Sequence, residues 1–421
     1  MEVLKLEFLD VATKDQLLNR SSFLDDAIKT SVLNVIEEVK LNGDDALKAF
    51  TQKFDRIALD QLSVSTSSFQ HAFDQVSDKL QLAMNQAKYQ LEKFHEQQRY
   101  QGYEIKTGPG IQLGQLIRPF ERVGIYVPKN LVSSLMMAAV PAKIAGVSEL
   151  IVCTPPQADG NAPETMRAAA ALLGIDEVYS VGGAQAVAAM AYGTGSIKKV
   201  DKIVGPGNAY VSAAKALVRD EVSIDMLAGP SEVLLIVEAV DGFSSEQLSE
   251  WILLELRAQL EHGPGTSAML ITQLPEVAEF VTSALQPEEL EQRHVAVLNY
   301  QDTQVALDFV NEYAPEHLCL WGESLENQLD LIKNAGSIFL GPWSPVAMGD
   351  YTSGTNHILP TARQARISHG LSVRDFVKTV SYQRLDQQGL LSLAETAITL
   401  AEFEGLERHA SSVRDRLAGA A

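Results

Sequence analysis

The chain has 421 residues, 46% of them hydrophobic, and exceeds the roughly 250–300 residues that one hydrophobic core serves, so we expect at least two domains. Asp and Glu number 54 against 34 Lys and Arg, a formal net charge of -20. No dense basic run provides the cations that nucleic acid or an anionic membrane surface needs, so both are excluded as expected partners.

Two cysteines, Cys153 and Cys319, cannot build a disulfide framework or a thiolate-rich zinc site, and a reducing, cytoplasmic compartment is expected. No export signal is visible at the N-terminus. The uncharged stretch 178–197 carries polar side chains and several glycines, which argues against a membrane span.

Hydrophobic periodicity predicts the elements along the chain. After a short N-terminal arm, apolar residues recur every three or four positions from Phe69 to Phe94, which predicts one long amphipathic helix. Short apolar runs separated by helical stretches and Gly/Pro turns then follow at 123–127, 150–153, 200–204, 233–237, 268–271, 295–298 and 337–340. Because parallel strands need helical crossovers, the alternation predicts two α/β modules with mostly parallel sheets. Beyond Arg374 the helical period returns, which predicts a C-terminal helical appendage.

Gln259 and His262 stand three residues apart where a helical stretch is closed by Gly263-Pro264. That spacing can place both side chains on one face, and imidazole and amide oxygen are acceptable zinc ligands. The alternative is a histidine favoured near a helix C-terminus by the helix dipole.

Glu316 and His317 are adjacent between a helical stretch and a short strand. A carboxylate that activates water and an imidazole that shuttles protons would suit general acid–base catalysis. An exposed polar turn is the alternative.

Two later segments also carry candidate residues. The run from Asp350 to His357 forms a polar, turn-rich loop that either lines a site or is solvated. Near the end of the chain, Glu404 and His409 could equally lie on a charged helix surface.

No G-x-G-x-x-G fingerprint is present, so glycine pattern does not predict a dinucleotide site. Gly182-Gly183 and Gly205-Pro-Gly207 each follow an apolar run and precede a helical one. Their backbone N–H groups could meet an anion, or they are ordinary strand-to-helix turns.

Taken in order, six motifs make almost the whole chain resemble the histidinol dehydrogenase family. They are Gly-Pro-Gly-Asn (205–208), Ala-Gly-Pro-Ser-Glu (228–232), Gln-x-x-His-Gly-Pro (259–264), Ala-Pro-Glu-His (314–317), Asp-Tyr-x-Ser-Gly-x-Asn-His (350–357) and Glu-Gly-Leu-x-x-His (404–409).

The resemblance implies a role for each matching position. It implies the zinc ligands Gln259, His262, Asp350 and His409 and the acid–base residues Glu316 and His317. It also implies the substrate contacts Ser231, His357 and Glu404 and the NAD contacts Tyr126, Gln185 and Asn208.

The resemblance further implies oxidation of L-histidinol through its aldehyde to L-histidine, with one zinc ion per site and two NAD molecules as hydride acceptors. The implied architecture is an N-terminal arm (1–22), a Rossmann-like module of 23–105 with 233–371 carrying the zinc and acid–base residues, a second incomplete module of 106–232 contributing NAD contacts, and an appendage of 372–421. The implied assembly is a homodimer in which terminal segments are exchanged and active sites are shared, so that Glu404 and His409 come from the neighbouring chain.

Two departures from the family pattern concern loops. Lys129-Asn130 stands where relatives usually have a glycine pair and a longer loop, and Ala362-Arg363 stands where many carry glycines. Two other readings remain: a paralogous zinc and NAD enzyme that oxidises another polar alcohol such as a sulfonated diol, or a zinc hydrolase. The presence of His357 and Glu404 argues against the paralogue, because those residues would recognise histidinol.

Overall fold

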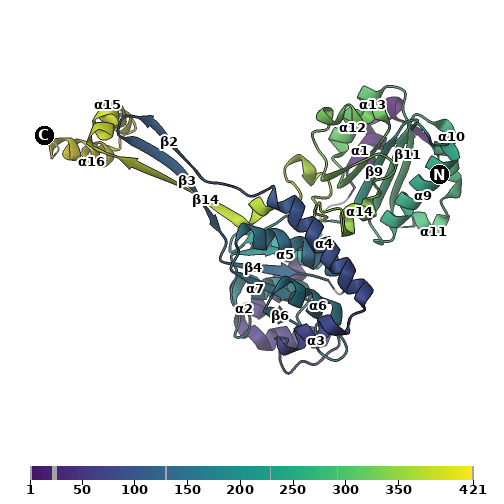
Figure 1. The fold of residues 1–421 in the computed structure, drawn as a ribbon, viewed down its shortest axis with the longest axis horizontal. Helices are drawn as coiled ribbons and strands as arrows, with labels where there is room; N and C mark the ends of the chain where they lie inside the picture. Colours follow the sequence, from purple (N-terminus) through teal and green to yellow (C-terminus); the bar gives the residue numbers. More distant parts are fainter. Residues whose placement is uncertain (1, 21–25, 129, 228, 292, 420–421) are drawn as a thin grey trace.

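A computed structural model describes residues 2–20, 26–128, 130–227, 229–291 and 293–419. Within these residues, two parallel sheets with helices on both faces form two modules, and a long arm projects away from them (Figure 1). The predicted α/β class with mostly parallel sheets is confirmed.

The first sheet has six strands. Their spatial order is β1 (Leu4–Lys5), β11 (His294–Asn299), β10 (Ser267–Thr272), β9 (Glu232–Val237), β12 (His317–Trp321) and β13 (Ser337–Leu340), and all described pairs are parallel. Helices α9 (Ser245–Leu260) and α10 (Pro275–Ala284) cover one face, and α12 (Thr303–Tyr313) covers the other. Because both faces are covered, every residue of β9 is buried, which explains its continuous apolar run.

The second sheet has five parallel strands, in the order β6 (Glu177–Tyr179), β5 (Glu149–Cys153), β4 (Arg122–Tyr126), β7 (Lys202–Val204) and β8 (Ser223–Ile224). One face packs against α5 (Val132–Ala145) and α6 (Glu164–Leu173), and the other against α7 (Gly183–Tyr192) and α8 (Ala209–Val218). The remaining short elements are η1 (Leu6–Phe8), α1 (Val11–Leu18), α11 (Pro287–Leu290), α13 (Glu323–Glu326), η2 (Leu329–Leu331), α14 (Val346–Tyr351), η3 (Gln364–Arg366) and η4 (Val373–Phe376).

The helices between residues 26 and 96 pack against the second sheet. Helix α2 (Asp26–Phe54), kinked at Gly43, contacts α7 and α8, while α3 (Ser67–Gln75) contacts α6 and α4 (Asp78–Glu96) contacts α5. The expected grouping of 23–105 with 233–371 is therefore corrected. The apolar faces of these helices find their partners in the module of 106–232, and hydrophobic periodicity reveals a buried face without revealing what buries it.

One helix expected from Phe69 to Phe94 is two helices. Helix α3 ends at Gln75 with Val76 in an extended conformation, and Ser77 begins α4 by accepting a hydrogen bond from the Leu80 N–H through its side chain. A serine N-cap stabilises a new helix start, so the apolar period continues across a break in the backbone.

The arm is a ribbon of three antiparallel strands that ends in two helices. The strand order is β14 (Val377–Leu385), β3 (Ile111–Pro119) and β2 (Tyr103–Gly108), followed by α15 (Gln387–Phe403) and α16 (Glu407–Ala418). The predicted helical appendage of 372–421 is thus wrong for 377–385, because β14 pairs over nine residues with β3, a partner more than 250 residues away.

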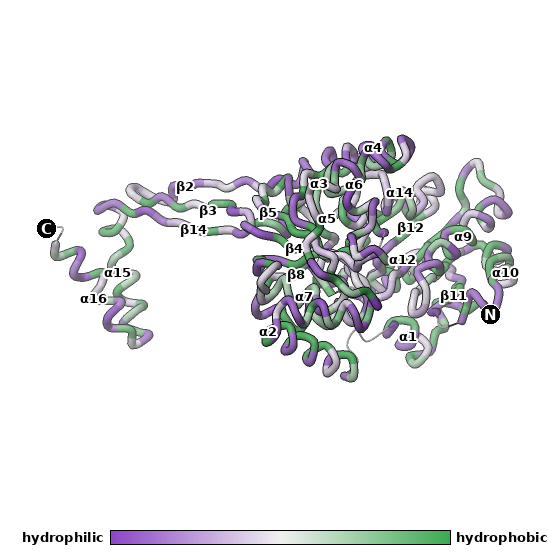
Figure 2. Tube along the Cα trace, turned by 90° about the horizontal axis from the view of Figure 1, so that it is seen from below, coloured by the Kyte–Doolittle hydropathy of each residue, from purple (hydrophilic) through white to green (hydrophobic). Residues whose placement is uncertain are grey.

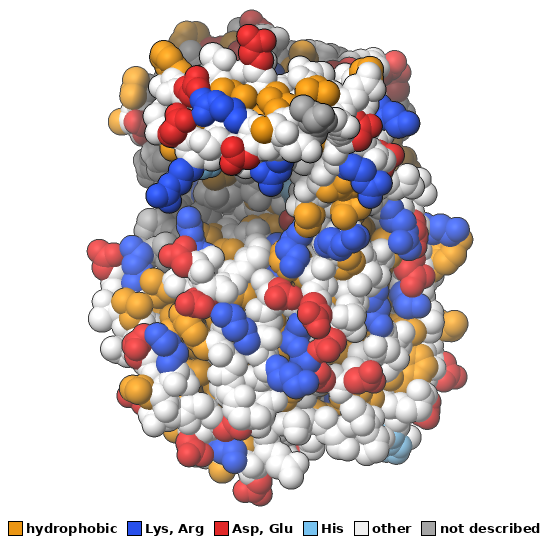
Figure 3. All heavy atoms as spheres, turned by 90° about the vertical axis from the view of Figure 1, so that its left-hand side faces the viewer, with side chains coloured by type: hydrophobic (Ala, Val, Ile, Leu, Met, Phe, Trp, Pro, Cys, Tyr) orange, Lys and Arg blue, Asp and Glu red, His pale blue; other side chains and the backbone are white. Residues whose placement is uncertain are grey.

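The arm stands apart from both modules in two perpendicular views (Figures 1 and 2). Its helices leave large apolar side chains in the open, among them Phe403 at 91% exposure, and Figure 3, which looks onto the end of the arm, shows hydrophobic side chains among charged ones. Exposed apolar patches of this kind are typical of interaction surfaces. None of the helices in the described ranges is both long and apolar enough to cross a membrane.

Candidate active site

A cavity of about 210 Å³ lies between the two modules. It opens at the amino ends of β9 and β12 and at the carboxyl ends of β7 and β8, since its walls include residues from 205–207, 225–231 and 316–317. Six of the predicted residues line it: Ser231, His262, Glu316, His317, Asp350 and His357. Side chains spread over more than 120 positions of the sequence therefore meet in one place.

Glu316 and His317 form a buried pair at the start of β12. Their exposed fractions are 5% and 4%, and Oε2 of Glu316 lies 3.6 Å from Nδ1 of His317. The Nδ1–H of His317 donates to the backbone oxygen of Glu232 at 2.8 Å, which leaves Nε2 as the ring atom able to accept a proton. The exposed-turn alternative for this pair is excluded by its burial.

Burial and neighbouring charges together set the pKa values of this pair. Burial raises the pKa of Glu316 to about 8, because an ionised carboxylate loses its hydration. For His317 burial acts in the opposite direction, but the carboxylates of Glu316 and Asp350 outweigh it and raise the pKa of the imidazole to about 9. Groups whose pKa lies near working pH are suited to acid–base catalysis.

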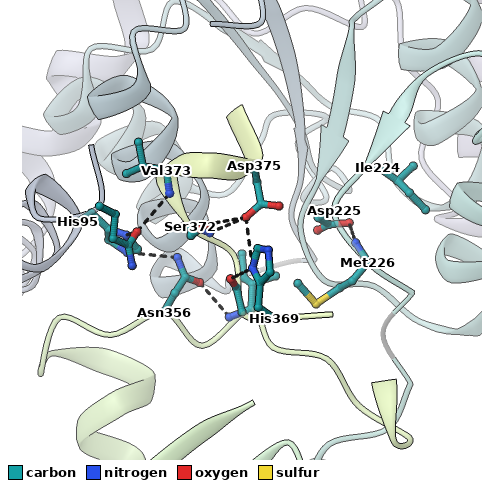
Figure 4. A network of polar contacts seen from close by, with 12 residues as sticks. His95, Ile224, Asp225, Met226, Asn356, His369, Ser372, Val373 and Asp375 are labelled. Carbon is teal, nitrogen blue, oxygen red and sulfur yellow. Dashed lines mark hydrogen bonds and ion pairs between the residues drawn. The ribbon is translucent and has the colours of Figure 1, made fainter. Parts of the chain in front are cut away.

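The loop from Asp350 to His357 is anchored by a buried amide. Asn356 donates from Nδ2 to the backbone oxygen of Met137 at 2.7 Å, and its Oδ1 accepts from the Ile358 N–H at 2.9 Å. Figure 4 shows this amide next to His95 of α4, whose Nε2 lies 3.4 Å from Nδ2. The loop is therefore fixed to the second module, which decides in favour of a structured cavity wall over a solvated loop.

His357 is oriented by a neighbour on each side of its ring. Its Nδ1–H donates to the backbone oxygen of Asp350 at 2.7 Å, and Nε2 lies 3.0 Å from the hydroxyl of Ser134. Burial lowers the pKa of His357, so a neutral ring is favoured.

Three of the proposed metal ligands, Gln259, His262 and Asp350, belong to the module of the first sheet. Gln259 is buried in the last turn of α9. His262, which follows α9, and Asp350, in α14, both line the cavity. The buried Nε2 of Gln259 has no hydrogen-bond partner among the described residues. Turning the amide by 180° would present Oε1 instead, so this donor set fits a borderline metal such as zinc.

Three or more His, Cys, Asp or Glu side chains do not converge into a metal cluster anywhere in the described part of this single chain. The reason is that only two of the proposed ligands near the cavity, His262 and Asp350, are of these residue types. The third proposed ligand is the amide of Gln259, and the fourth, His409, lies elsewhere. His409, in α16, and Glu404, just after α15, are exposed on the far arm (Figure 1) and do not line the cavity. The structure of one chain does not bring these two residues to the site.

A second cavity, of about 420 Å³, contains the three predicted NAD contacts. Tyr126 ends β4, Gln185 lies in the first turn of α7 and Asn208 is the N-cap of α8. The carboxyl ends of parallel strands and the N-termini of the following helices are where α/β folds bind nucleotides. The N-cap role of Asn208 also shows that its segment is a structural strand-to-helix turn.

Of the two loops that depart from the family pattern, one is described by the structure at both positions. Lys129 lies outside the described residues. Ala362 and Arg363 take left-handed conformations with φ of 47° and 64°, which glycine adopts with less strain. The Ala362 N–H donates to Oε1 of Glu232 at 2.9 Å, so the loop keeps this unusual backbone while holding a buried carboxylate.

Comparison with known proteins decides the family. The family model described as histidinol dehydrogenase matches residues 18–417. The chain belongs to the histidinol dehydrogenase family. Histidinol dehydrogenase of Methanothermobacter thermautotrophicus is 42% identical over 430 residues, covering 99% of each chain, and that of Vibrio parahaemolyticus is 40% identical, covering 99% of this chain and 98% of the relative.

The fold agrees with a solved member of the histidinol dehydrogenase family. The crystal structure of histidinol dehydrogenase from Elizabethkingia anophelis superposes with a TM-score of 0.89 at 36% identity, over 98% of this chain and 97% of that one. The resemblance drawn from six ordered motifs is thereby confirmed over nearly the whole chain.

Sequence reasoning missed two buried residues that hydrogen bonds link to the Glu316–His317 pair, Arg20 and Glu232. Glu232 is the last residue of the Ala-Gly-Pro-Ser-Glu motif, so the motif could have pointed to it. Arg20 stands in the N-terminal arm, more than 200 positions from its partner, and no local pattern singles it out.

Proposed function

We propose that the protein oxidises L-histidinol through L-histidinaldehyde to L-histidine, with two NAD molecules as hydride acceptors. The observation that carries the proposal is the buried Glu316–His317 pair, which lies in one cavity with Ser231, His262, Asp350 and His357. Membership of the histidinol dehydrogenase family supports NAD as the cofactor and histidinol as the substrate.

The metal site is assigned to Gln259, His262 and Asp350, with His409 as the fourth ligand. These residues would hold zinc, and the metal would supply a positive charge that orients the nitrogen atoms of the substrate. NAD would occupy the cavity of Tyr126, Gln185 and Asn208 and accept a hydride at each of two stages.

The acid–base roles follow from the hydrogen bonds. His317 donates through Nδ1 to a backbone oxygen, so Nε2 takes the proton of the alcohol as the first hydride leaves. Glu316, with its raised pKa, takes a proton from the water that adds to the aldehyde carbon. The resulting diol then loses the second hydride. Ser231 and His357 bind the substrate on the cavity walls, and retention between stages keeps the reactive aldehyde out of solvent.

The arm supports a homodimeric assembly. Glu404 and His409 are exposed at the end of a ribbon that leads away from the chain's own cavity (Figures 1 and 2), and the surrounding helices expose Leu400 and Phe403. We assign these helices to the active site of a second copy, in a homodimer with shared sites. Burial of the exposed apolar residues would favour that docking.

The deciding experiment is an assay with purified protein, L-histidinol and NAD, followed by absorbance of the reduced nicotinamide. Two reduced nicotinamides per histidinol and L-histidine as product are expected. No reduction with histidinol, but reduction with a sulfonated diol, would support a paralogous alcohol dehydrogenase. Metal-dependent hydrolysis without nicotinamide reduction would support a zinc hydrolase instead.

A further inference from the structure

The backbone of Glu232 holds both members of the catalytic pair. Its N–H donates to Oε2 of Glu316 at 2.7 Å, and its carbonyl oxygen accepts from Nδ1 of His317 at 2.8 Å. One residue at the start of β9 therefore sets the position of the carboxylate and the tautomer of the imidazole. A shift of this peptide would move both groups at once.

The side chain of Glu232 is in turn fixed by Arg20. Nε and Nη2 of Arg20 donate to Oε1 and Oε2 of Glu232 at 3.0 and 2.8 Å, a two-pronged contact that restricts orientation as well as distance. Both side chains are only 3% exposed. A buried ion pair is weak evidence for stability, because desolvation offsets much of the attraction, so its effect on geometry is the more informative one.

Arg20 also contacts Tyr313, in the segment that precedes the catalytic pair. Its guanidinium lies 3.4 Å from the ring centroid of Tyr313, and Nη2 donates to the Tyr313 backbone oxygen at 3.0 Å. Tyr313 is the last residue of α12, three positions before Glu316. A single guanidinium thus ties the start of β9 to the turn from which Glu316 projects.

We propose that Arg20 is a positioning residue for the reaction, acting through Glu232 to keep Glu316 and His317 in their working geometry. The inference rests on the proposed roles of these two residues. Arg20 touches no substrate or cofactor site: it lines neither the cavity of about 210 Å³ nor that of about 420 Å³. Its effect is therefore on the rate of the chemical steps and not on binding.

The test compares Arg20→Met and Arg20→Lys in the full-length, zinc-loaded enzyme. In Arg20→Met, kcat with histidinol falls by about 100-fold, the loss typical of a small displacement of catalytic groups. The KM for histidinol, the Kd for NAD measured by calorimetry and the zinc content stay within about twofold of wild type. Arg20→Lys keeps the positive charge but not the two-pronged contact with Glu232, so its kcat falls by less than that of Arg20→Met. Guanidinium ion added to Arg20→Ala restores part of kcat.

Arg122→Met is the matched control. Arg122 is 8% exposed and pairs with the more exposed carboxylates of Glu149 and Glu177 in the second module, so its loss removes ion pairs of a buried arginine without touching the catalytic pair. It keeps kcat per folded subunit near that of wild type.

Equal kcat values for the Arg20 and Arg122 variants, per folded and zinc-loaded subunit, would overturn the inference, as would an Arg20→Met defect confined to KM. If Arg20→Met does not fold, the same comparison is made with Arg20→Lys. The acid–base roles proposed for Glu316 and His317 fail separately, if Glu316→Gln and His317→Gln both oxidise histidinol at the wild-type rate. The proposed function itself fails if the wild-type protein does not reduce NAD with histidinol. If kcat falls severely in Glu316→Gln and His317→Gln but not in Arg20→Met or Arg20→Lys, only the positioning role of Arg20 is refuted.

Discussion

His317 and Asp350 lie side by side in the lining of the cavity, with 3.6 Å between Nε2 and Oδ1. The atom assigned to accept the alcohol proton therefore lies beside a carboxylate assigned to the metal. In the proposed mechanism, metal binding and proton transfer would be coupled at this point, because a cation on Asp350 would reduce the negative charge near the imidazole.

Chelation is expected to abolish oxidation of histidinol, and added zinc is expected to restore it, because the ligand set consists of nitrogen and oxygen donors. The measurement is nicotinamide reduction after dialysis against a strong chelator, then after titration with zinc, with circular dichroism to establish that the metal-free chain stays folded. Full activity of verified metal-free protein would disprove the metal assignment of Gln259, His262 and Asp350.

Glu316→Gln is expected to impair the second oxidation more than the first. In the proposed mechanism the carboxylate activates water at the aldehyde stage, whereas His317 serves the alcohol stage. Rates with histidinol and with histidinaldehyde, measured under single-turnover conditions, separate the two stages. Equal losses with both substrates would contradict the role given to Glu316.

The metal-free protein is expected to lose stability as pH rises. Burial raises the pKa of Glu316, and for His317 the Glu316 and Asp350 carboxylates overcome burial and raise the imidazole pKa. The native state then binds more protons than the unfolded chain, so the free energy of unfolding falls between about pH 7 and 9.

Urea unfolding of the metal-free wild type, Glu316→Gln and Glu279→Gln at both pH values measures this effect. Glu316→Gln should show a shallower decline, because it removes one of the two raised groups and part of the charge acting on the other. Glu279, on the exposed part of α10, serves as control and should follow wild type. A decline in Glu316→Gln as steep as that of wild type would argue against the pKa assignment.

Mixed dimers test the shared site. Co-expression of differently tagged His409→Ala and His262→Ala chains, each inactive alone, should give doubly tagged dimers with one intact site. Up to about a quarter of wild-type activity is expected in a randomly reassorted mixture, since half the dimers are mixed and each has one of two sites. Inactive but verified mixed dimers would mean that His409 serves its own chain, leaving the zinc assignment standing.

Asn356→Ala is expected to lower the free energy of unfolding by about 1–3 kcal/mol, because it leaves the Met137 oxygen and the Ile358 N–H without their buried partner. The same change should reduce kcat/KM for histidinol, since His357 is the adjacent residue. Chemical denaturation and steady-state kinetics provide the two measurements. Ser353→Ala, exposed in the same loop, is the control, and equal behaviour of the two variants would refute the anchoring role.

The amino-acid sequence by itself determined the α/β class, the order of the six motifs and most strands of the two parallel sheets. The short strands β1, β6 and β8 were not predicted. Continuous apolar runs such as 233–237 are local signals, because a strand buried on both faces must be apolar at every position. Glu316, His317 and Asp350 could be named from sequence because they stand in short motifs, and the resemblance supplied the roles that spacing left open.

Only the tertiary structure decided which sheet each helix covers, that β14 joins a ribbon and that Arg20 reaches Glu232. These features depend on contacts between residues far apart in the chain, such as β14 with β3, and periodicity records a buried face without recording its partner. The same holds for the cavity, whose walls come from both modules. Its geometry exists only after the sheets have packed, because the backbone groups of Glu232 meet the catalytic pair across neighbouring strands.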